Sequence, residues 1–84
     1  MIRLRLLSRP GCHLCERMRQ EVDELLGDAP REWDVVDVET EPDLARRFGD
    51  QIPILFVNDR LFAKTRLPRL GLGLRLRRAA GLSG

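Results

Sequence analysis

Residues 8–15 read SRPGCHLC, and the hydrophobic period of the chain changes within this stretch. Before it, apolar and charged residues alternate from Ile2 to Leu6, which is the period of a half-buried strand. After it, apolar residues recur between positions 15 and 26 at the spacing of one helical face. Pro10-Gly11 is a turn signal between the two patterns. The sequence therefore predicts a strand, a tight turn and a helix whose first turn carries Cys12 and Cys15.

The rest of the chain divides into short elements of the same two kinds. Strands are predicted at Trp33–Val38, Ile52–Val57 and Arg60–Ala63, and helices at Pro42–Phe48, capped by Thr40, and at about Leu67–Gly81. A helix joins the first two strands, so these must be parallel, whereas the turn residues Asn58-Asp59 make the last two an antiparallel hairpin. We therefore expect one α/β domain over residues 1–84, of order β-α-β-α-β-β-α, with a four-stranded mixed sheet and helices on both faces.

Composition narrows the class of protein. The chain has 84 residues, of which 43% are hydrophobic and 33% charged, as in a folded soluble domain. No apolar run approaches the roughly 20 residues that span a bilayer, and the N-terminus lacks the apolar region of a signal peptide. We expect a cytoplasmic protein that does not enter a membrane.

Charge is distributed unevenly, although the net charge is only +2. Acidic residues concentrate between Glu16 and Asp50, and arginines between Arg66 and Arg78. Such a basic end can bind nucleic acid or an acidic partner, but it is more often a solvated helix face. No aromatic residue follows position 66, so a base-stacking surface is absent there and nucleic acid is not an expected partner.

The two cysteines suit chemistry better than structural cross-linking. Secreted disulfide scaffolds carry more of them, and a loop this short gains little stability from closure. A cysteine at a helix N-terminus has a lowered thiol pKa, because the free N–H groups and the helix dipole favour negative charge. We therefore predict catalytic roles for Cys12, as the attacking thiolate, and for Cys15, as the sulfur that resolves the mixed disulfide.

Two alternatives compete with redox chemistry. Cys12, Cys15 and His13 could bind zinc, but structural zinc takes four ligands and the sequence has no second cysteine pair and no other histidine. We expect no metal site, and a metal or cluster shared between two chains is the weaker alternative. Inert packing suits Cys15, which lies on the apolar helical face, but it does not suit Cys12 in a turn.

Other residues near the motif have candidate roles. His13 could stabilise the Cys12 thiolate or could be a plain surface residue, and Arg9 could attract an anionic peptide. Trp33 fits the core of a strand. From the residues alone, Pro53 reads as an ordinary trans proline at a strand start, because the cis form is the minority one.

The segment at residues 8–15 resembles the glutaredoxin active site, and its Cys-His-Leu-Cys form is similar to a group of small bacterial glutaredoxin-like proteins. Gln51-Ile52-Pro53 and the apolar strand after it resemble the segment that carries a cis-proline in glutaredoxins and thioredoxins. The resemblance covers about Ile2 to Arg60. It implies a thioredoxin fold, the roles given above for the two cysteines, and a cis Pro53. The substrate-binding residues that we expect are Arg9, Gly11, His13, Ile52 and Pro53, with the Ile52 backbone pairing with an extended substrate or glutathione.

One stretch departs from the glutaredoxin pattern. Glutaredoxins follow the last hairpin with a Gly-Gly and an acidic residue that help to hold glutathione, whereas residues 62–66 here read FAKTR. We therefore expect no bound cofactor, with either glutathione or a reductase as the electron donor. The predicted function is thiol–disulfide exchange with protein disulfides or glutathione, by a monomer. The alternative is a non-catalytic module that binds a partner protein through the Ile52 edge and the basic tail.

Overall fold

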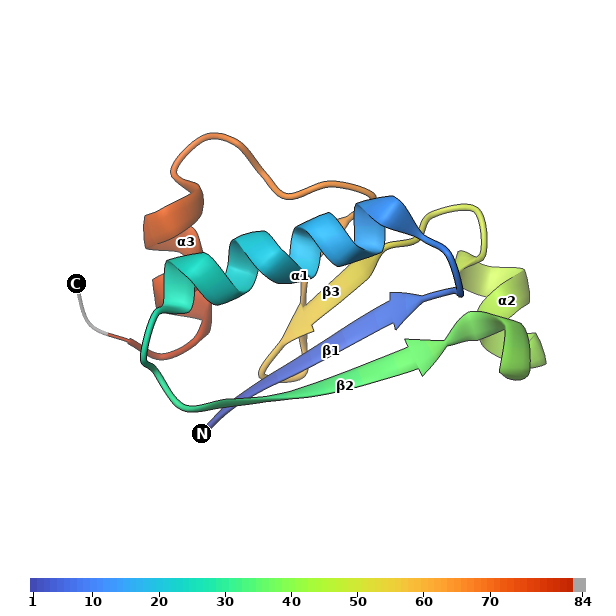
Figure 1. Ribbon diagram of the computed structural model, residues 1–84, viewed down its shortest axis with the longest axis horizontal. Coiled ribbons are helices and arrows are strands. Elements are labelled where there is room, and N and C mark those ends of the chain that lie inside the picture. The colour runs from blue at the N-terminus through green and yellow to red at the C-terminus, as the bar shows by residue number, and fades with distance from the viewer. Residues whose placement is uncertain (83–84) are drawn as a thin grey trace.

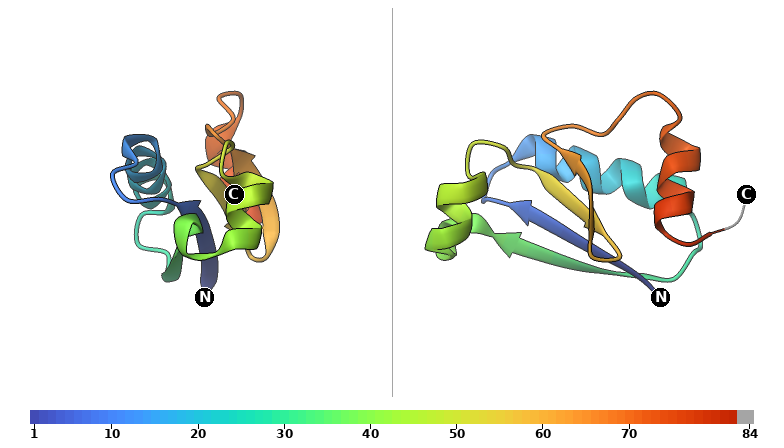
Figure 2. Two further views of the ribbon diagram at one scale, coloured as in Figure 1. Left: turned by 90° about the vertical axis from the view of Figure 1, so that its right-hand side faces the viewer. Right: turned by 180° about the vertical axis from the view of Figure 1, so that it is seen from behind.

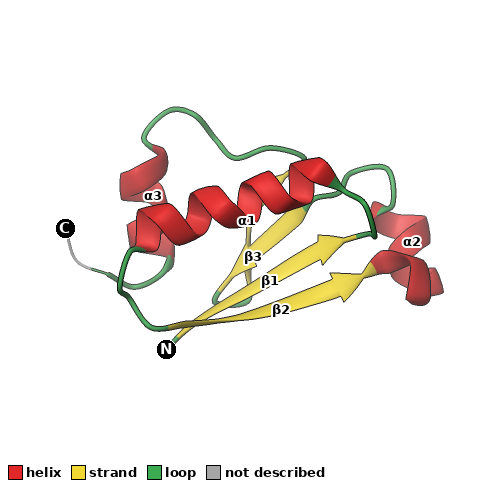
Figure 3. Cartoon of the chain, in the orientation of Figure 1, coloured by secondary structure: helices red, strands yellow, loops and turns green. Residues whose placement is uncertain are grey.

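The computed structural model describes residues 1–82, in which strands and helices alternate (Figures 1 and 3). The elements are β1 (Ile2–Ser8), α1 (His13–Leu26), β2 (Arg31–Asp37), the 3-10 helix η1 (Val38–Thr40), α2 (Pro42–Phe48), β3 (Ile54–Val57), β4 (Arg60–Lys64) and α3 (Leu72–Ala79). The domain predicted over residues 1–84 also includes positions 83 and 84, which lie outside the described residues. None of the helices within residues 1–82 is long and apolar enough to cross a bilayer.

The sheet contains the predicted parallel pair and the predicted hairpin. Its strand order is β2-β1-β3-β4, with β1 parallel to β2 and antiparallel to β3, and with β3 antiparallel to β4. The long helical connection permits the parallel pair, and Asn58-Asp59, both at positive φ, form the hairpin turn. The result is the thioredoxin fold, a four-stranded mixed sheet with helices on both faces.

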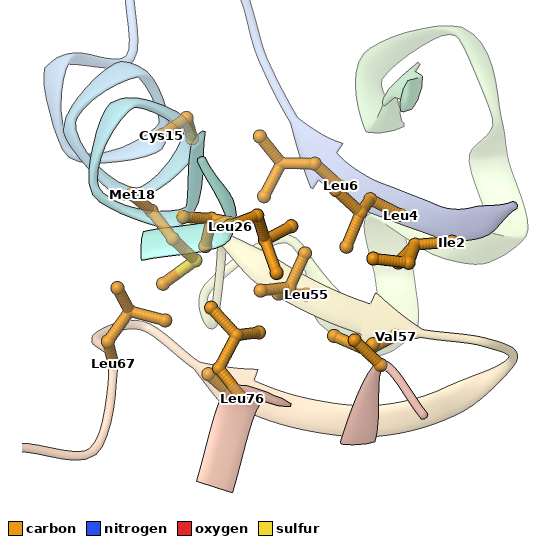
Figure 4. Close-up of a cluster of buried hydrophobic side chains, with 13 residues drawn as sticks. Ile2, Leu4, Leu6, Cys15, Met18, Leu26, Leu55, Val57, Leu67 and Leu76 are labelled. Atoms are coloured by element: carbon orange, nitrogen blue, oxygen red, sulfur yellow. The ribbon is translucent and has the colours of Figure 1, made fainter. Parts of the chain in front are cut away.

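One face of the sheet holds the main core. Strand residues alternate between faces, so Leu4 and Leu6 of β1 point to the same side as Leu55 and Val57 of β3. Helices α1 and α3 cover this side, and Figure 4 shows Met18, Leu26 and Leu76 meeting the strand residues there. The amphipathic pattern of residues 15–26 therefore places α1 directly on the central strands.

The opposite face is only partly covered. Leu7 and Ile54 pack there with Val38, and Leu44 and Phe48 of α2 cover them. Figure 2 shows α2 at one end of the sheet, on the side away from α1. Because α2 is only seven residues long, the rest of this face is left to charged side chains, among which Arg3 pairs with Asp59 and Arg5 with Asp34.

Several predicted element boundaries are wrong. β2 is Arg31–Asp37 instead of Trp33–Val38, and β4 ends at Lys64 instead of Ala63. Thr40 lies in η1, and α2 is instead preceded by Glu41, without a side-chain cap, although Pro42 opens the helix as predicted. β3 begins at Ile54, two residues later than predicted. α3 begins only after Gly71, whose φ of 67° is left-handed, because residues 67–71 form a loop. Leu67 is nevertheless buried in the core, so its apolar character reflects packing without a helix.

The C-terminal end of α1 is tied to β2 by Asp23. The guanidinium of Arg31 donates to the Asp23 carboxylate at 2.8 Å and also to the Gly27 carbonyl oxygen, just after the last helical turn. The Trp33 indole N–H donates to the same carboxylate at 2.9 Å, and Arg19 stacks over the Trp33 ring. Trp33 packs against the core, as predicted.

These contacts shift the titration of Asp23. Burial raises the pKa of this carboxyl, but the hydrogen bonds from Arg31 and Trp33 outweigh that effect. Together with the nearby positive charges, they hold the pKa below its ordinary value of 3.8. Asp23 therefore stabilises the fold above pH 3.8, and this stabilisation is lost as the pH falls through the pKa of the folded protein.

We expect Asp23→Asn to lower the free energy of unfolding by about 1 kcal/mol at pH 7, a value reduced by the partial exposure of the carboxylate. Urea denaturation at a series of pH values measures this. The difference from wild type should shrink as the pH falls from 3.8 through the lower pKa of the folded protein, because Asp23 then becomes protonated. Asp34→Asn, which breaks an exposed pair with Arg5, is the matched control and should cost less than about 0.5 kcal/mol. If Asp34→Asn lowered the free energy of unfolding by more than Asp23→Asn does, the special role of Asp23 would be contradicted.

Candidate active site

The turn between β1 and α1 places Cys12 at the helix start. Gly11 has a φ of 73°, a left-handed conformation that glycine adopts without strain. Cys12 is then extended and serves as the N-cap, with its Sγ accepting a hydrogen bond from the Cys15 N–H at 3.2 Å. The Cys12 carbonyl oxygen accepts from the Glu16 N–H, also at 3.2 Å, which begins the helix. The predicted strand–turn–helix junction is confirmed.

The two sulfurs differ in accessibility. A disulfide joins Cys12 and Cys15, whose Cα atoms are 5.3 Å apart. Cys15 is only 2% exposed and belongs to the main core, whereas Cys12 is half-buried at its edge. A thiol or thiolate from outside can therefore approach Cys12 but not Cys15. In the reduced protein, a negative charge on Cys12 would lie at the positive end of the α1 dipole.

The Ile52–Pro53 peptide bond is cis, so the trans form expected from the residues alone is wrong and the form implied by the resemblance is correct. The chain entering β3 passes beside the first turn of α1 in both views (Figures 1 and 2). Ile52 and Cys12 pack against the same core cluster. Among residues 1–82, neither the N–H nor the carbonyl of Ile52 has a hydrogen-bond partner. An extended chain could therefore pair with this backbone.

Thr65 holds this segment, and the sequence analysis assigned it no role. Its N–H donates to the Pro53 carbonyl oxygen at 2.6 Å, and its hydroxyl donates to the Gln51 carbonyl oxygen at 3.1 Å. Its φ of 68° is unfavourable for a β-branched residue, so the surrounding contacts must impose it. The partners are more than ten positions away in the chain, and no local pattern at residues 62–66 signals such a contact.

Of the other predicted substrate-binding residues, Arg9 and Gly11 line a hollow with the two cysteines, and His13 does not. The hollow is shallow and measures about 240 Å³. The Arg9 guanidinium donates to the Gly49 carbonyl oxygen, which ties the turn to the end of α2. His13 is exposed, and its imidazole makes no hydrogen bond or ion pair with residues 1–82. The substrate-binding roles of these residues stay predictions.

Within the described part of the chain, no three histidine, cysteine or acidic side chains are grouped so that they could hold a metal ion.

Comparison with known proteins identifies a family. The sequence model of the Glutaredoxin-like domain (DUF836) matches residues 3–76. The solution NMR structure of protein Ne2328 from Nitrosomonas europaea is similar, with 29% sequence identity and a TM-score of 0.68 over 79% of this chain and 80% of that one. No curated protein matches the chain significantly.

Two more distant structures show the fold alone. A malarial protein has a TM-score of 0.58 at 17% identity, with 95% of this chain and 97% of that chain covered. A thioredoxin variant from Halobacterium salinarum NRC-1 has a TM-score of 0.55, also at 17% identity, with coverage of 99% and 78%.

We expect Thr65→Ala to lower the free energy of unfolding by about 0.5–1 kcal/mol, because it removes the hydroxyl hydrogen bond to Gln51. Urea denaturation at pH 7 measures the change. Thr65→Ser keeps the hydroxyl and is the matched control, which should retain most of the stability. Equal losses in the two variants would show that the hydroxyl contributes nothing to holding the segment.

Proposed function

The chain belongs to the Glutaredoxin-like domain (DUF836) family, and we propose that it is a thiol–disulfide oxidoreductase acting through Cys12 and Cys15. The observation that carries this proposal is the difference in accessibility between the paired sulfurs. A half-buried first cysteine at a helix N-terminus and a fully buried second cysteine one turn later suit sequential attack. We also infer that the chain falls within the Cys-His-Leu-Cys group of this family.

The reaction exchanges two electrons. In the reduced protein, the Cys12 thiolate attacks one sulfur of a substrate disulfide, so a mixed disulfide forms and the other substrate sulfur leaves as a thiolate. Cys15 then loses its proton and attacks the Cys12 sulfur, which releases the second substrate thiolate. Both thiolates gain protons from solvent. The substrate disulfide is thereby reduced to two thiols, and the protein is oxidised to the Cys12–Cys15 disulfide. The same steps in reverse would oxidise a dithiol substrate.

The resolving step requires little movement. Cys15 is held by the core, and its N–H already donates to the Cys12 sulfur at 3.2 Å. The Cys15 side chain therefore lies within one helical turn of any mixed disulfide on Cys12. Fixed proximity of this kind favours the intramolecular attack over release of the substrate by an external thiol.

Substrate would dock on the segment before β3. In this proposal, the free N–H and carbonyl of Ile52 pair with an extended chain. Pro53 has no N–H, so it offers that chain no second backbone donor. Gly11 leaves the approach to Cys12 open, since it has no side chain. Arg9 and His13 supply positive charge or hydrogen bonds beside the sulfur.

The donor that returns the protein to its dithiol form is a thiol such as glutathione, two molecules of which become one disulfide, or a reductase protein. Protein disulfides or glutathione disulfide are the proposed substrates. We place this activity in the cytoplasm and assign it to a monomer without a bound cofactor. These assignments follow the expectations drawn from the composition and motifs of the chain.

Replacement of each cysteine tests the mechanism. We expect Cys12→Ser to lose at least about 99% of the reduction of insulin or hydroxyethyl disulfide, because the attacking sulfur is absent. Cys15→Ser should still attack but should accumulate the mixed disulfide, which mass spectrometry detects. Ser8→Ala, near the turn but without a sulfur, is the control and should retain activity.

Three results bear on the alternatives. Failure of the wild-type protein to reduce either disulfide would contradict the proposal. Retention of cellular function by Cys12→Ser would favour the binding module instead. Stoichiometric metal in protein purified without oxygen would favour a metal or cluster carrier.

A further inference from the structure

A groove runs along α1 beside the active site, on the side of the β4–α3 loop. Helix α1 contributes Leu14, Arg17 and Met18 to its lining, and the loop contributes Arg66, Leu67 and Arg69. Met18 and Leu67 are both buried and face each other in Figure 4, so they form the apolar floor. The groove therefore has an apolar floor with arginines along its sides.

The arginines of this groove have no charge partner in the part of the chain that the structure describes. Arg17, Arg66 and Arg69 are exposed, and their guanidinium groups make no hydrogen bond or ion pair with residues 1–82. Glu21 is the one acid in the lining, and it too makes no ion pair within the described residues. Three positive charges against one negative charge leave the groove basic, although the whole chain has a net charge of only +2.

The groove begins at the site of disulfide exchange. Leu14 lies within the Cys-His-Leu-Cys motif and is 54% exposed, and Thr65, which holds the Ile52–Pro53 segment, also lines the groove. From Leu14 to Glu21, α1 rises by roughly 10 Å, which an extended peptide covers in about three residues. A chain whose cysteine is joined to Cys12 would therefore pass the arginines about two to four residues from that cysteine.

We propose that this groove binds an acidic segment of a polypeptide substrate, about two to four residues from the substrate cysteine; this inference rests on the proposed disulfide exchange. The groove measures about 270 Å³ and is open, less than the roughly 300–1,000 Å³ of pockets that enclose small ligands. An open groove of this size suits the side chains of an extended polypeptide better than a small molecule, which binds in an enclosed pocket. Carboxylates on that chain meet the unpartnered guanidinium groups.

The test compares disulfide-bonded peptides that differ only in charge. One peptide carries three aspartates two to four residues from its cysteine, a second carries three asparagines at those positions, and a third carries three lysines. Each peptide is made in two forms, with this segment before or after the cysteine. We expect kcat/KM for the better aspartate peptide to exceed that for its asparagine counterpart on the order of tenfold at low salt. In Arg66→Gln/Arg69→Gln this ratio should fall below about threefold. In the wild-type protein, the ratio should also fall as the salt concentration is raised.

Matched controls separate a local groove from general charge. Arg75→Gln/Arg78→Gln removes the same charge from α3, whose arginines do not line the groove, and should keep the preference. Binding of the aspartate peptide to the Cys12→Ser/Cys15→Ser protein, measured by fluorescence anisotropy, reads the groove without any redox step. It should weaken when Arg66 and Arg69 are replaced.

Equal kcat/KM for all the peptides would overturn the inference while leaving disulfide exchange intact. If Arg66→Gln/Arg69→Gln and Arg75→Gln/Arg78→Gln both lose the preference for aspartate, the preference reflects the general positive charge of the protein, and the inference is overturned too. If only glutathione disulfide shows dependence on Arg66 and Arg69, the ligand is the free tripeptide and the polypeptide proposal is wrong. If no disulfide is reduced, the proposed function fails, and the anisotropy measurement alone then decides whether the groove binds acidic chains.

Discussion

Cys15, in the first turn of α1, packs in the same apolar cluster as Leu4, Leu6 and Val22, and this burial sets the position of the motif around it. With Cys15 held in the core, the preceding turn must bring Cys12 to the helix end, which the left-handed Gly11 permits. One sulfur is then accessible and the other is not. The proposed roles of attack and resolution therefore rest on this difference in packing, because the two residues are chemically identical.

A second constraint comes from the far end of the chain. Thr65, just after β4, donates two hydrogen bonds to the segment that enters β3, so the hairpin closes back on its own beginning. Within residues 1–82, the Ile52 backbone is then left without a hydrogen-bond partner beside the first turn of α1. The surface beside Cys12 is therefore built from three separate parts of the chain, which are the β1–α1 turn, the start of β3 and the exit from β4.

The pairing of charges distinguishes two basic surfaces. On the open face of the sheet, Arg3 and Arg5 are matched by Asp59 and Asp34. Along the groove beside α1, the guanidinium groups of Arg66 and Arg69 have no partner within residues 1–82. An arginine already paired on its own sheet gains less from an incoming carboxylate than one that is free. The unpaired set lines the groove that also contains Leu14 of the Cys-His-Leu-Cys motif, where we propose that an acidic segment of a substrate binds.

The sequence by itself determined the elements that depend on near neighbours. The changes of period, the turn at Pro10-Gly11 and the hairpin at Asn58-Asp59 predicted the strand–helix order, the mixed sheet and the place of both cysteines. Only the tertiary structure decided the role of Thr65, the late start of α3 and the basic groove, and it confirmed the cis bond at Pro53, which the family resemblance implied but the residues alone did not. Each of these depends on contacts between residues distant in sequence. Leu67 illustrates the reason. A leucine at this position fits either a helix or a buried loop, and only the packing of the folded chain shows that Leu67 is buried in a loop before α3.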